Sequence, residues 1–241
     1  MIQIKNVTKN YGEICGINSI TMTIPENSIT GFLGINGAGK STLLKAIAGV
    51  HYPSAGEILI NNHSIEKERK IIQKDIGFLS EKLFLPPNFF VNEILVFCAS
   101  VFFQKKERKA AIEQVVNLCQ LESVYKKKIG SLSKGFYQRL ALALSLIHDP
   151  KILILDEPTS GLDPLQTMRI RELIKKLSLS KTILLSTHIM QEAVALCDYI
   201  CIMHQGIALE QGTISDICTK TNTNTLEEAF LQIIHENKRN T

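Results

Sequence analysis

The sequence predicts an α/β protein with a core of mixed sheet and helices, an N-terminal antiparallel β region and an inserted helical lobe. Short β-rich runs and turns fill about the first sixty residues, helical periodicity dominates residues 81–149, and strands alternate with helices again from Lys151. With 241 residues and 45% hydrophobic content, the chain can bury a full core. We therefore expect a single domain: an α/β core in 1–80 and 151–220, the lobe at about 81–150, and a C-terminal helix and tail at about 225–241.

The N-terminal region begins with three segments that read as strands, at residues 1–7, 20–24 and 57–61. Asn61 and Asn62 predict a tight turn after the third, because asparagine tolerates positive φ. Between the second and third segments, residues 28–50 read as a strand, a glycine-rich loop and a helix. Gly49 and Pro53 mark the end of that helix.

The remaining elements follow from periodicity. Helices are expected in the lobe at 90–103, 105–119 and 134–147. Beyond the lobe we expect a strand at 151–156, a helix at 165–179, a strand at 181–188, a helix at 189–197 and a strand at 198–206. The segment 225–241 reads as a short amphipathic helix with a frayed polar end.

The segment GINGAGKS, residues 34–41, fits the pattern G-x-x-x-x-G-K-[ST] between a strand and a helix. Its glycines let backbone N–H groups curl around phosphate oxygens without Cβ clashes. Lys40 is expected to reach the β- and γ-phosphates, and Ser41 to offer its hydroxyl to Mg²⁺. The helix N-terminus adds a favourable dipole, so this loop predicts an ATP-binding core.

Two further segments place polar side chains after apolar strands. Asp156 and Glu157 end a strand that carries no internal charge. Such a pair is commonly a solvated loop, but together with Lys40 it fits an aspartate that holds Mg²⁺ beside a glutamate that polarises the attacking water. His188 follows the strand LLST, where it could contact the γ-phosphate, although a histidine at a strand end is more often structural.

Taken together, these motifs and three others resemble the ATP-binding subunits of ABC transporters, from Ile2 to about Glu228. LSKGFYQR, at 132–139, is similar to the family signature, and SGLD, at 160–163, resembles the family's D-loop. His188 falls on the switch histidine, and the segment KNYG places Tyr11 where the family stacks an aromatic ring on adenine.

The resemblance assigns roles to residues of this sequence. Catalysis would use Glu157 and His188, and Mg²⁺ would be held by Ser41 and Asp156, with a weak contribution from Glu81. The implied nucleotide contacts are Tyr11, Asn36, Gly37, Ala38, Gly39, Lys40, Ser41, Thr42 and Asp163, with Ser133 and Gly135 acting in trans from a second subunit.

Three positions depart from the usual family pattern. Lys134 stands where the signature usually has glycine, and Phe136 where it usually has glutamine. Glu81 replaces the glutamine that links the metal site to the membrane subunit, and a carboxylate can still approach Mg²⁺ through water. These variations resemble the branch that works with separate permeases for drugs, lipids, polysaccharides or antibiotics.

The resemblance implies an ATP-hydrolysing subunit that dimerises around ATP, as a homodimer, and powers transport, in the export direction, through a separate transmembrane permease. A short permease helix would enter a groove near Glu81 and the helical lobe, on the cytoplasmic face of the membrane. The alternative is a soluble ABC-type ATPase that acts on nucleic acid or ribosomes, but such relatives usually carry long coiled coils or a second ATPase core. A P-loop kinase would leave the segment 132–139 and His188 unexplained.

The composition of the chain limits which kinds of partner are expected. The net charge is only +4, so charge alone does not argue for nucleic acid, and none is expected as a partner. The basic clusters at 105–109 and 126–128 are expected to be solvated faces rather than lipid or nucleic-acid sites.

The apolar run 94–103 is shorter than the roughly 20 residues that a bilayer requires, and the N-terminus lacks a signal-peptide pattern. Six cysteines without a CxxC pair predict reduced, mostly buried thiols.

Overall fold

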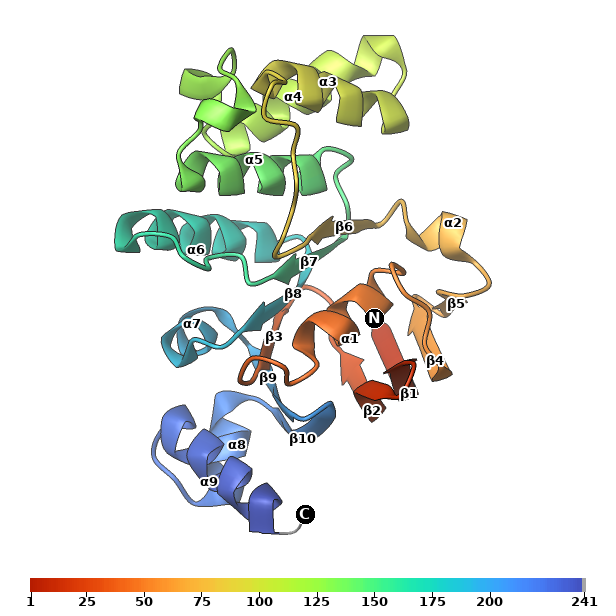
Figure 1. Cartoon of the computed structure of the whole chain (residues 1–241), viewed down its shortest axis with the longest axis vertical. Coiled ribbons are helices and arrows are strands. Elements are labelled where there is room, and N and C mark those ends of the chain that lie inside the picture. Colours follow the sequence, from red (N-terminus) through yellow and green to blue (C-terminus); the bar gives the residue numbers. More distant parts are fainter. Residues whose placement is uncertain (240–241) are drawn as a thin grey trace.

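The computed structural model describes residues 1–239 and contains two β-sheets, with helices at both ends and on both sides of the larger one (Figure 1). The smaller sheet is antiparallel, with the strand order β2-β1-β4-β5. Its strands are β1 (Ile2–Tyr11), β2 (Ile14–Ile24), β4 (Ala55–Ile60) and β5 (His63–Ser64). Asn61 and Asn62 both adopt positive φ between β4 and β5, which confirms the predicted turn. The predicted antiparallel β region is therefore present.

The larger sheet has the order β10-β9-β3-β8-β7-β6, and all neighbouring strands are parallel except the antiparallel pair of β10 and β9. Its strands are β3 (Ile29–Leu33), β6 (Ile76–Leu79), β7 (Ile152–Asp156), β8 (Thr182–Thr187), β9 (Tyr199–His204) and β10 (Ile207–Gly212). Every residue of β3, β7 and β8 is buried, because a central parallel strand is covered on both faces. The carboxyl ends of these three strands lead into residues 34–41, 157–163 and 188, which brings the predicted motifs to one edge.

All the predicted helices are present in the predicted order, and two further helices form at 69–72 and 214–221. The helices are α1 (Lys40–Ile47), α2 (Arg69–Ile72), α3 (Val91–Phe102), α4 (Lys105–Leu118), α5 (Lys134–Leu146), α6 (Pro164–Ser178), α7 (Met190–Leu196), α8 (Ile214–Thr221) and α9 (Leu226–Arg239), with short 3₁₀ turns at Glu122–Val124 and Ile129–Ser131. The predicted helical lobe comprises α3, α4 and α5, which lie at one end of the molecule (Figure 1). Its apolar side chains form one continuous core with one face of the larger sheet. This shared core supports our proposal that the whole chain is a single domain.

Some elements exceed the sequence prediction. β2 begins at Ile14 rather than residue 20, although its first half is rich in small and polar residues. Strands β5, β6 and β10 and helices α2 and α8 were not predicted. The first half of β2 and the whole of β10 form by pairing with β1 and β9 respectively, and local sequence carries little information about such pairing.

The cysteines divide by position. All six are free; Cys119, Cys197 and Cys201 are buried, and burial raises the pKa of each of these thiols to about 12. The prediction of mostly buried thiols holds for these three, whereas Cys15 is exposed.

The predicted C-terminal helix is present as α9, while residues 240 and 241 of the expected tail lie outside the described residues. Leu226 and Ala229 are buried in the same core as α7, and Phe230 and Ile233 pack against it. The helix therefore docks on the core through its apolar stripe.

Removal of this helix is expected to destabilise the protein. A chain that ends at Asn222 should melt at a lower temperature, because the core face covered by α9 becomes exposed to water. Leu226→Ala should lower the free energy of unfolding by about 2–5 kcal/mol, since Leu226 is 2% exposed. The matched variant Leu231→Ala, at a position 54% exposed, should change it little. Thermal and denaturant unfolding measure both, and equal stability of the two variants would contradict the docking.

Candidate active site

A cavity of about 450 Å³ lies at the carboxyl edge of the larger sheet, beside the first residues of β2. Its lining combines most of the residues that the sequence singled out with four that it did not. It is lined by Tyr11, Ile14, Cys15, Gly16, Asn36, Gly37, Ala38, Gly39, Lys40, Ser41, Thr42, Glu81, Glu157, Ser160 and His188. The fold thus gathers side chains from five separate parts of the chain around one cavity.

The glycine-rich loop ends at Gly39, which precedes α1 and has a φ of 97°. A Cβ atom at this position would stand 2.7 Å from the carbonyl oxygen of Gly16, so both the backbone conformation and the available space require glycine. No side chain caps the N-terminus of α1, and its first turn contains no acidic residue. The open N–H groups and the helix dipole therefore favour an anion at this end of the cavity.

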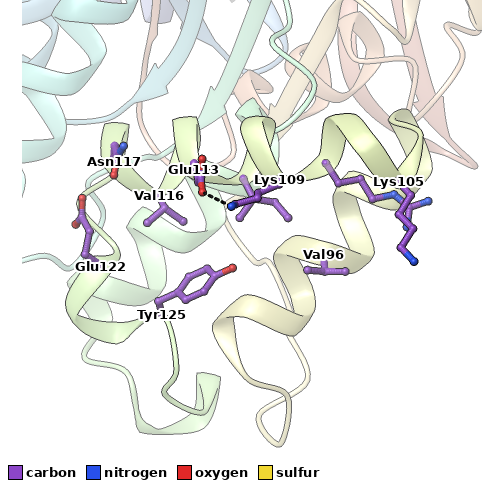
Figure 2. Close-up of a pocket in the computed structure, with 10 residues that line it drawn as sticks. Val96, Lys105, Lys109, Glu113, Val116, Asn117, Glu122 and Tyr125 are labelled. Carbon is purple, nitrogen blue, oxygen red and sulfur yellow. Dashed lines mark ion pairs between the residues drawn. The ribbon is translucent and has the colours of Figure 1, made fainter.

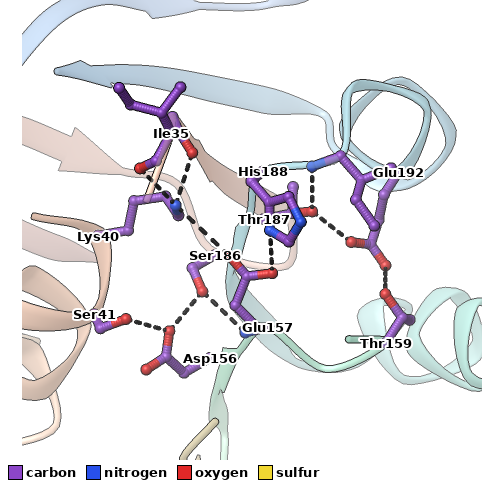
Figure 3. A network of polar contacts seen from close by, with 12 residues as sticks. Ile35, Lys40, Ser41, Asp156, Glu157, Thr159, Ser186, Thr187, His188 and Glu192 are labelled. Atoms are coloured by element: carbon purple, nitrogen blue, oxygen red, sulfur yellow. Dashed lines mark hydrogen bonds and ion pairs between the residues drawn. The ribbon is translucent and has the colours of Figure 1, made fainter. Parts of the chain in front are cut away.

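Lys40 is buried and folds back on its own loop (Figure 3). Its Nζ donates hydrogen bonds to the carbonyl oxygens of Gly34, at 2.7 Å, and Ile35, at 3.2 Å, and lies 3.6 Å from Oε1 of Glu157. Burial lowers the pKa of Lys40, while the neighbouring Glu157 carboxylate opposes that shift. The ammonium is thus held at the loop by weak acceptors that a phosphate could replace.

Asp156 accepts two hydrogen bonds on the same oxygen (Figure 3). Ser41 Oγ donates to Oδ1 of Asp156 at 2.8 Å, and Ser186 Oγ donates to it at 2.6 Å. Hydroxyl and carboxylate oxygens are the hard ligands that Mg²⁺ takes, and adjacent ligands of an octahedral Mg²⁺ stand about 2.9 Å apart. Ser41 and Asp156 therefore fit a Mg²⁺ ion in both donor type and spacing.

Glu157 and His188 form a pair at the mouth of the cavity. His188 Nδ1 lies 2.9 Å from Oε2 of Glu157, whose side chain is only 10% exposed. Glu157 adopts a φ of 52°, a left-handed conformation that is uncommon for residues other than glycine, and its N–H donates to Ser186 Oγ at 2.9 Å. This turn directs a carboxylate towards Lys40, as a base for water at a phosphate would require.

Tyr11 and Glu81 lie at the rim. The Tyr11 ring is partly exposed and meets His51 edge-on, at 5.8 Å between ring centroids. Glu81 is exposed, and Ile14 lies opposite Tyr11 in the β1–β2 pair. That pairing brings Ile14, Cys15 and Gly16 to the cavity. The sequence analysis could have identified these three residues only by predicting a β-hairpin immediately after Tyr11.

The remaining predicted contacts lie outside the cavity. Ser133 caps the N-terminus of α5, where its hydroxyl accepts a hydrogen bond from the N–H of Phe136, while Gly135 packs against Gln166. Asp163 begins α6 and accepts a hydrogen bond from the N–H of Gln166 at 2.9 Å. None of these three residues lines the cavity around Lys40, so one chain does not bring the signature to its own glycine-rich loop.

The fold and the site define a P-loop ATPase. The chain belongs to the ABC transporter family, because the family profile described as "ABC transporter" matches residues 17–160. It is 35% identical over 216 residues to the Nod factor export ATP-binding protein I of Burkholderia orbicola, covering 88% of this chain and 70% of that protein. It is also 32% identical over 246 residues to the probable multidrug ABC transporter ATP-binding protein YbhF of Escherichia coli, of which it spans 42%.

A solved relative links this fold to nucleotide hydrolysis. The chain resembles a dimeric ATP-binding cassette bound to ADP and phosphate in a post-hydrolysis state, with a TM-score of 0.80 and 28% identity. The similarity covers 88% of this chain and 98% of that structure. The protein is thus an ATP-binding cassette that hydrolyses ATP. Among residues 1–239, no helix combines the length and apolar character needed to cross a membrane.

Proposed function

We propose that this ATPase powers export of a substrate through a separate transmembrane permease, as a homodimer on the cytoplasmic face of the membrane. The names of the relatives, Nod factor export and multidrug transporter proteins, support the export direction and disfavour the nucleic-acid alternative. The dimeric cassette among the solved relatives supports pairing of two subunits. The main observation in favour of a permease partner is an apolar surface on the helical lobe.

This surface lies on α3, where Phe97 and Val101 are 63% and 68% exposed. Phe84, in the segment before α3, is also exposed, and the cavity residue Glu81 is three positions earlier. A hollow of about 680 Å³ opens between α3 and α4, with Val96 and Tyr125 among the residues that line it (Figure 2). Phe97 and Val101 are four positions apart on one helix and therefore lie on the same face of it. Neighbouring exposed apolar side chains mark an interaction site, which suits a permease helix.

Residues of this chain would bind the nucleotide and accept the proton of the attacking water. Tyr11 would stack on adenine, and the N–H groups and side chains of residues 36–42 would hold the phosphates, with Lys40 exchanging its carbonyl partners for phosphate oxygens. Glu157 would accept the proton of the attacking water, and His188 would contact the γ-phosphate while remaining next to Glu157.

The metal and the second subunit would complete the site. Ser41 and Asp156 would hold Mg²⁺, with Glu81 reaching it through water, and the ion would neutralise charge on the β- and γ-phosphates. Ser133 and Gly135 of the second copy would cap the γ-phosphate, and Asp163 would contact the nucleotide at the subunit boundary. The failure of these three residues to line the cavity of their own chain supports this arrangement.

Permease docking can be tested with the double variant Phe97→Glu and Val101→Glu. Two charges on α3 should abolish co-purification of a multi-span membrane protein from detergent-solubilised membranes, while ATP affinity stays unchanged. Mass spectrometry identifies the captured chain, which should also alter the ATPase rate when it is added back. The matched control Leu179→Glu, at an 84% exposed apolar position just past α6, should retain the partner. Equal capture by the double variant would place the permease elsewhere.

A further inference from the structure

A buried polar cluster lies beside the Glu157–His188 pair (Figure 3). At its centre is Glu192, in the first turn of α7, with a side chain 1% exposed. Thr187 Oγ1 donates a hydrogen bond to Oε2 of Glu192 at 2.6 Å, and Thr159 Oγ1 donates to Oε1. Each carboxylate oxygen therefore binds one threonine hydroxyl.

The Glu192 carboxylate has only a weak cationic partner. The nearest cationic partner that forms an ion pair with it is Arg171 on α6, with Nε at 3.9 Å, beyond hydrogen-bond distance. The Nε of Arg171 has no hydrogen-bond partner among the described residues. Burial of a weakly paired carboxylate opposes folding, and an apolar side chain of the same size would avoid that penalty. A gain in stability therefore does not explain why this position holds a carboxylate.

The two threonines account for the carboxylate better, because each lies within two residues of a catalytic side chain. Thr159 follows Glu157 by two residues, and Thr187 immediately precedes His188. Thr187 Oγ1 also accepts a hydrogen bond from the N–H of Ile189 at 3.0 Å, so its hydroxyl fixes the turn on both sides of His188. Through these two hydroxyls, Glu192 links the turn after β7 to the end of β8.

We infer that Glu192 is a positioning residue that holds Glu157 and His188 at the spacing needed for hydrolysis. Glu192 does not line the nucleotide cavity and acts only through Thr159 and Thr187. The inference rests on the roles proposed above for Glu157 and His188. Loss of one hydroxyl frees the loop that it anchors, and a displacement of about 1 Å in a catalytic group can lower a rate about 10²-fold.

The test begins with variants that remove one hydroxyl but keep the side-chain shape. Thr159→Val and Thr187→Val should each lower kcat roughly ten- to a hundredfold with little change in ATP affinity. Thr159→Ser and Thr187→Ser keep the hydroxyl and should restore most of the rate. Thr30→Val is the matched control, because Thr30 is equally buried but its hydroxyl has no partner among the described residues. Rates as low for the serine variants as for the valine variants would overturn the inference.

A second measurement separates positioning from general destabilisation. Glu192→Gln and Thr187→Val are each combined with His188→Ala, and single-turnover rates are measured with enzyme in excess. If the cluster acts by positioning the two catalytic side chains, the loss caused by Thr187→Val should disappear once His188 is absent, and the loss caused by Glu192→Gln should shrink to the part that acts on Glu157 through Thr159. The same fold-loss in both backgrounds would reduce Glu192 to a structural role.

The outcomes distinguish the inference from the proposed function. If His188→Ala alone leaves the rate unchanged, the proposed role of His188 fails, and with it the premise. If His188→Ala lowers the rate but Glu192→Gln and both valine variants do not, the inference about Glu192 fails while the proposed function stands.

Discussion

In the purified protein, Glu157→Gln is expected to lower ATP turnover about 10²-fold or more while ATP binding survives. An amide keeps the size of the side chain but cannot accept a proton from water. The Glu157 carboxylate lies 2.9 Å from Nδ1 of His188 and 3.6 Å from Nζ of Lys40. The substitution therefore removes the proton acceptor and leaves the phosphate-binding loop in place. The contacts of Lys40 with Gly34 and Ile35 do not depend on Glu157.

The same variant should accumulate a stable dimer with ATP, because closure no longer leads to cleavage. Size-exclusion chromatography with and without ATP measures the dimer, and phosphate release measures turnover. Glu172→Gln is the matched control, since Glu172 is an exposed carboxylate on α6 that does not line the cavity. Near-normal turnover in Glu157→Gln would assign the role of base to another residue.

The sequence predicted those parts of the site that depend on short contiguous segments. The loop 34–41 folds as predicted because its glycines and the following helix determine its conformation locally. Asp156, Glu157 and His188 could be placed because each follows an apolar strand, and the ends of parallel strands meet at one edge of a sheet. The fold class and the family were predicted correctly for the same reason.

Contacts between distant segments could not be predicted. Ile14, Cys15 and Gly16 reach the cavity only because β2 pairs with β1, and β10 exists only through its pairing with β9. Glu192 is a single acidic residue in an amphipathic helix, and nothing in the surrounding sequence distinguishes it from a solvated one. Its burial depends on how α7 packs against β8, which is a property of the tertiary structure.

The position of Ser133 leads to the second large effect. Ser133 and Gly135 lie at the start of α5 and do not line the cavity that contains Lys40, although the family resemblance has both regions contact one ATP. We therefore expect the signature to act on the nucleotide held by the other subunit. A heterodimer of one Lys40→Ala subunit and one Ser133→Arg subunit should then occlude about one ATP, whereas each variant homodimer should occlude none.

This expectation follows from how the two substitutions are distributed between the two ATP sites of the dimer. Across subunits, the loop lesion of one chain and the signature lesion of its partner fall in the same composite site, so the other site is intact. Within one chain, each site would carry one lesion and no ATP would be occluded. Lys40→Ala removes the ammonium at the phosphates, and Ser133→Arg replaces the small residue that caps α5 with a bulky one.

Occlusion is a better measurement than turnover, because two sites that depend on each other could both stop after a single lesion. Labelled ATP retained after rapid gel filtration counts occluded nucleotides per dimer, and two distinct affinity tags isolate the heterodimer. Ser180→Arg adds the same charge to an exposed serine that lies outside the cavity, and its homodimer should keep both nucleotides. If the mixed dimer is folded, stable and empty while the Ser180→Arg dimer is full, the two surfaces act within one chain and the head-to-tail arrangement is wrong.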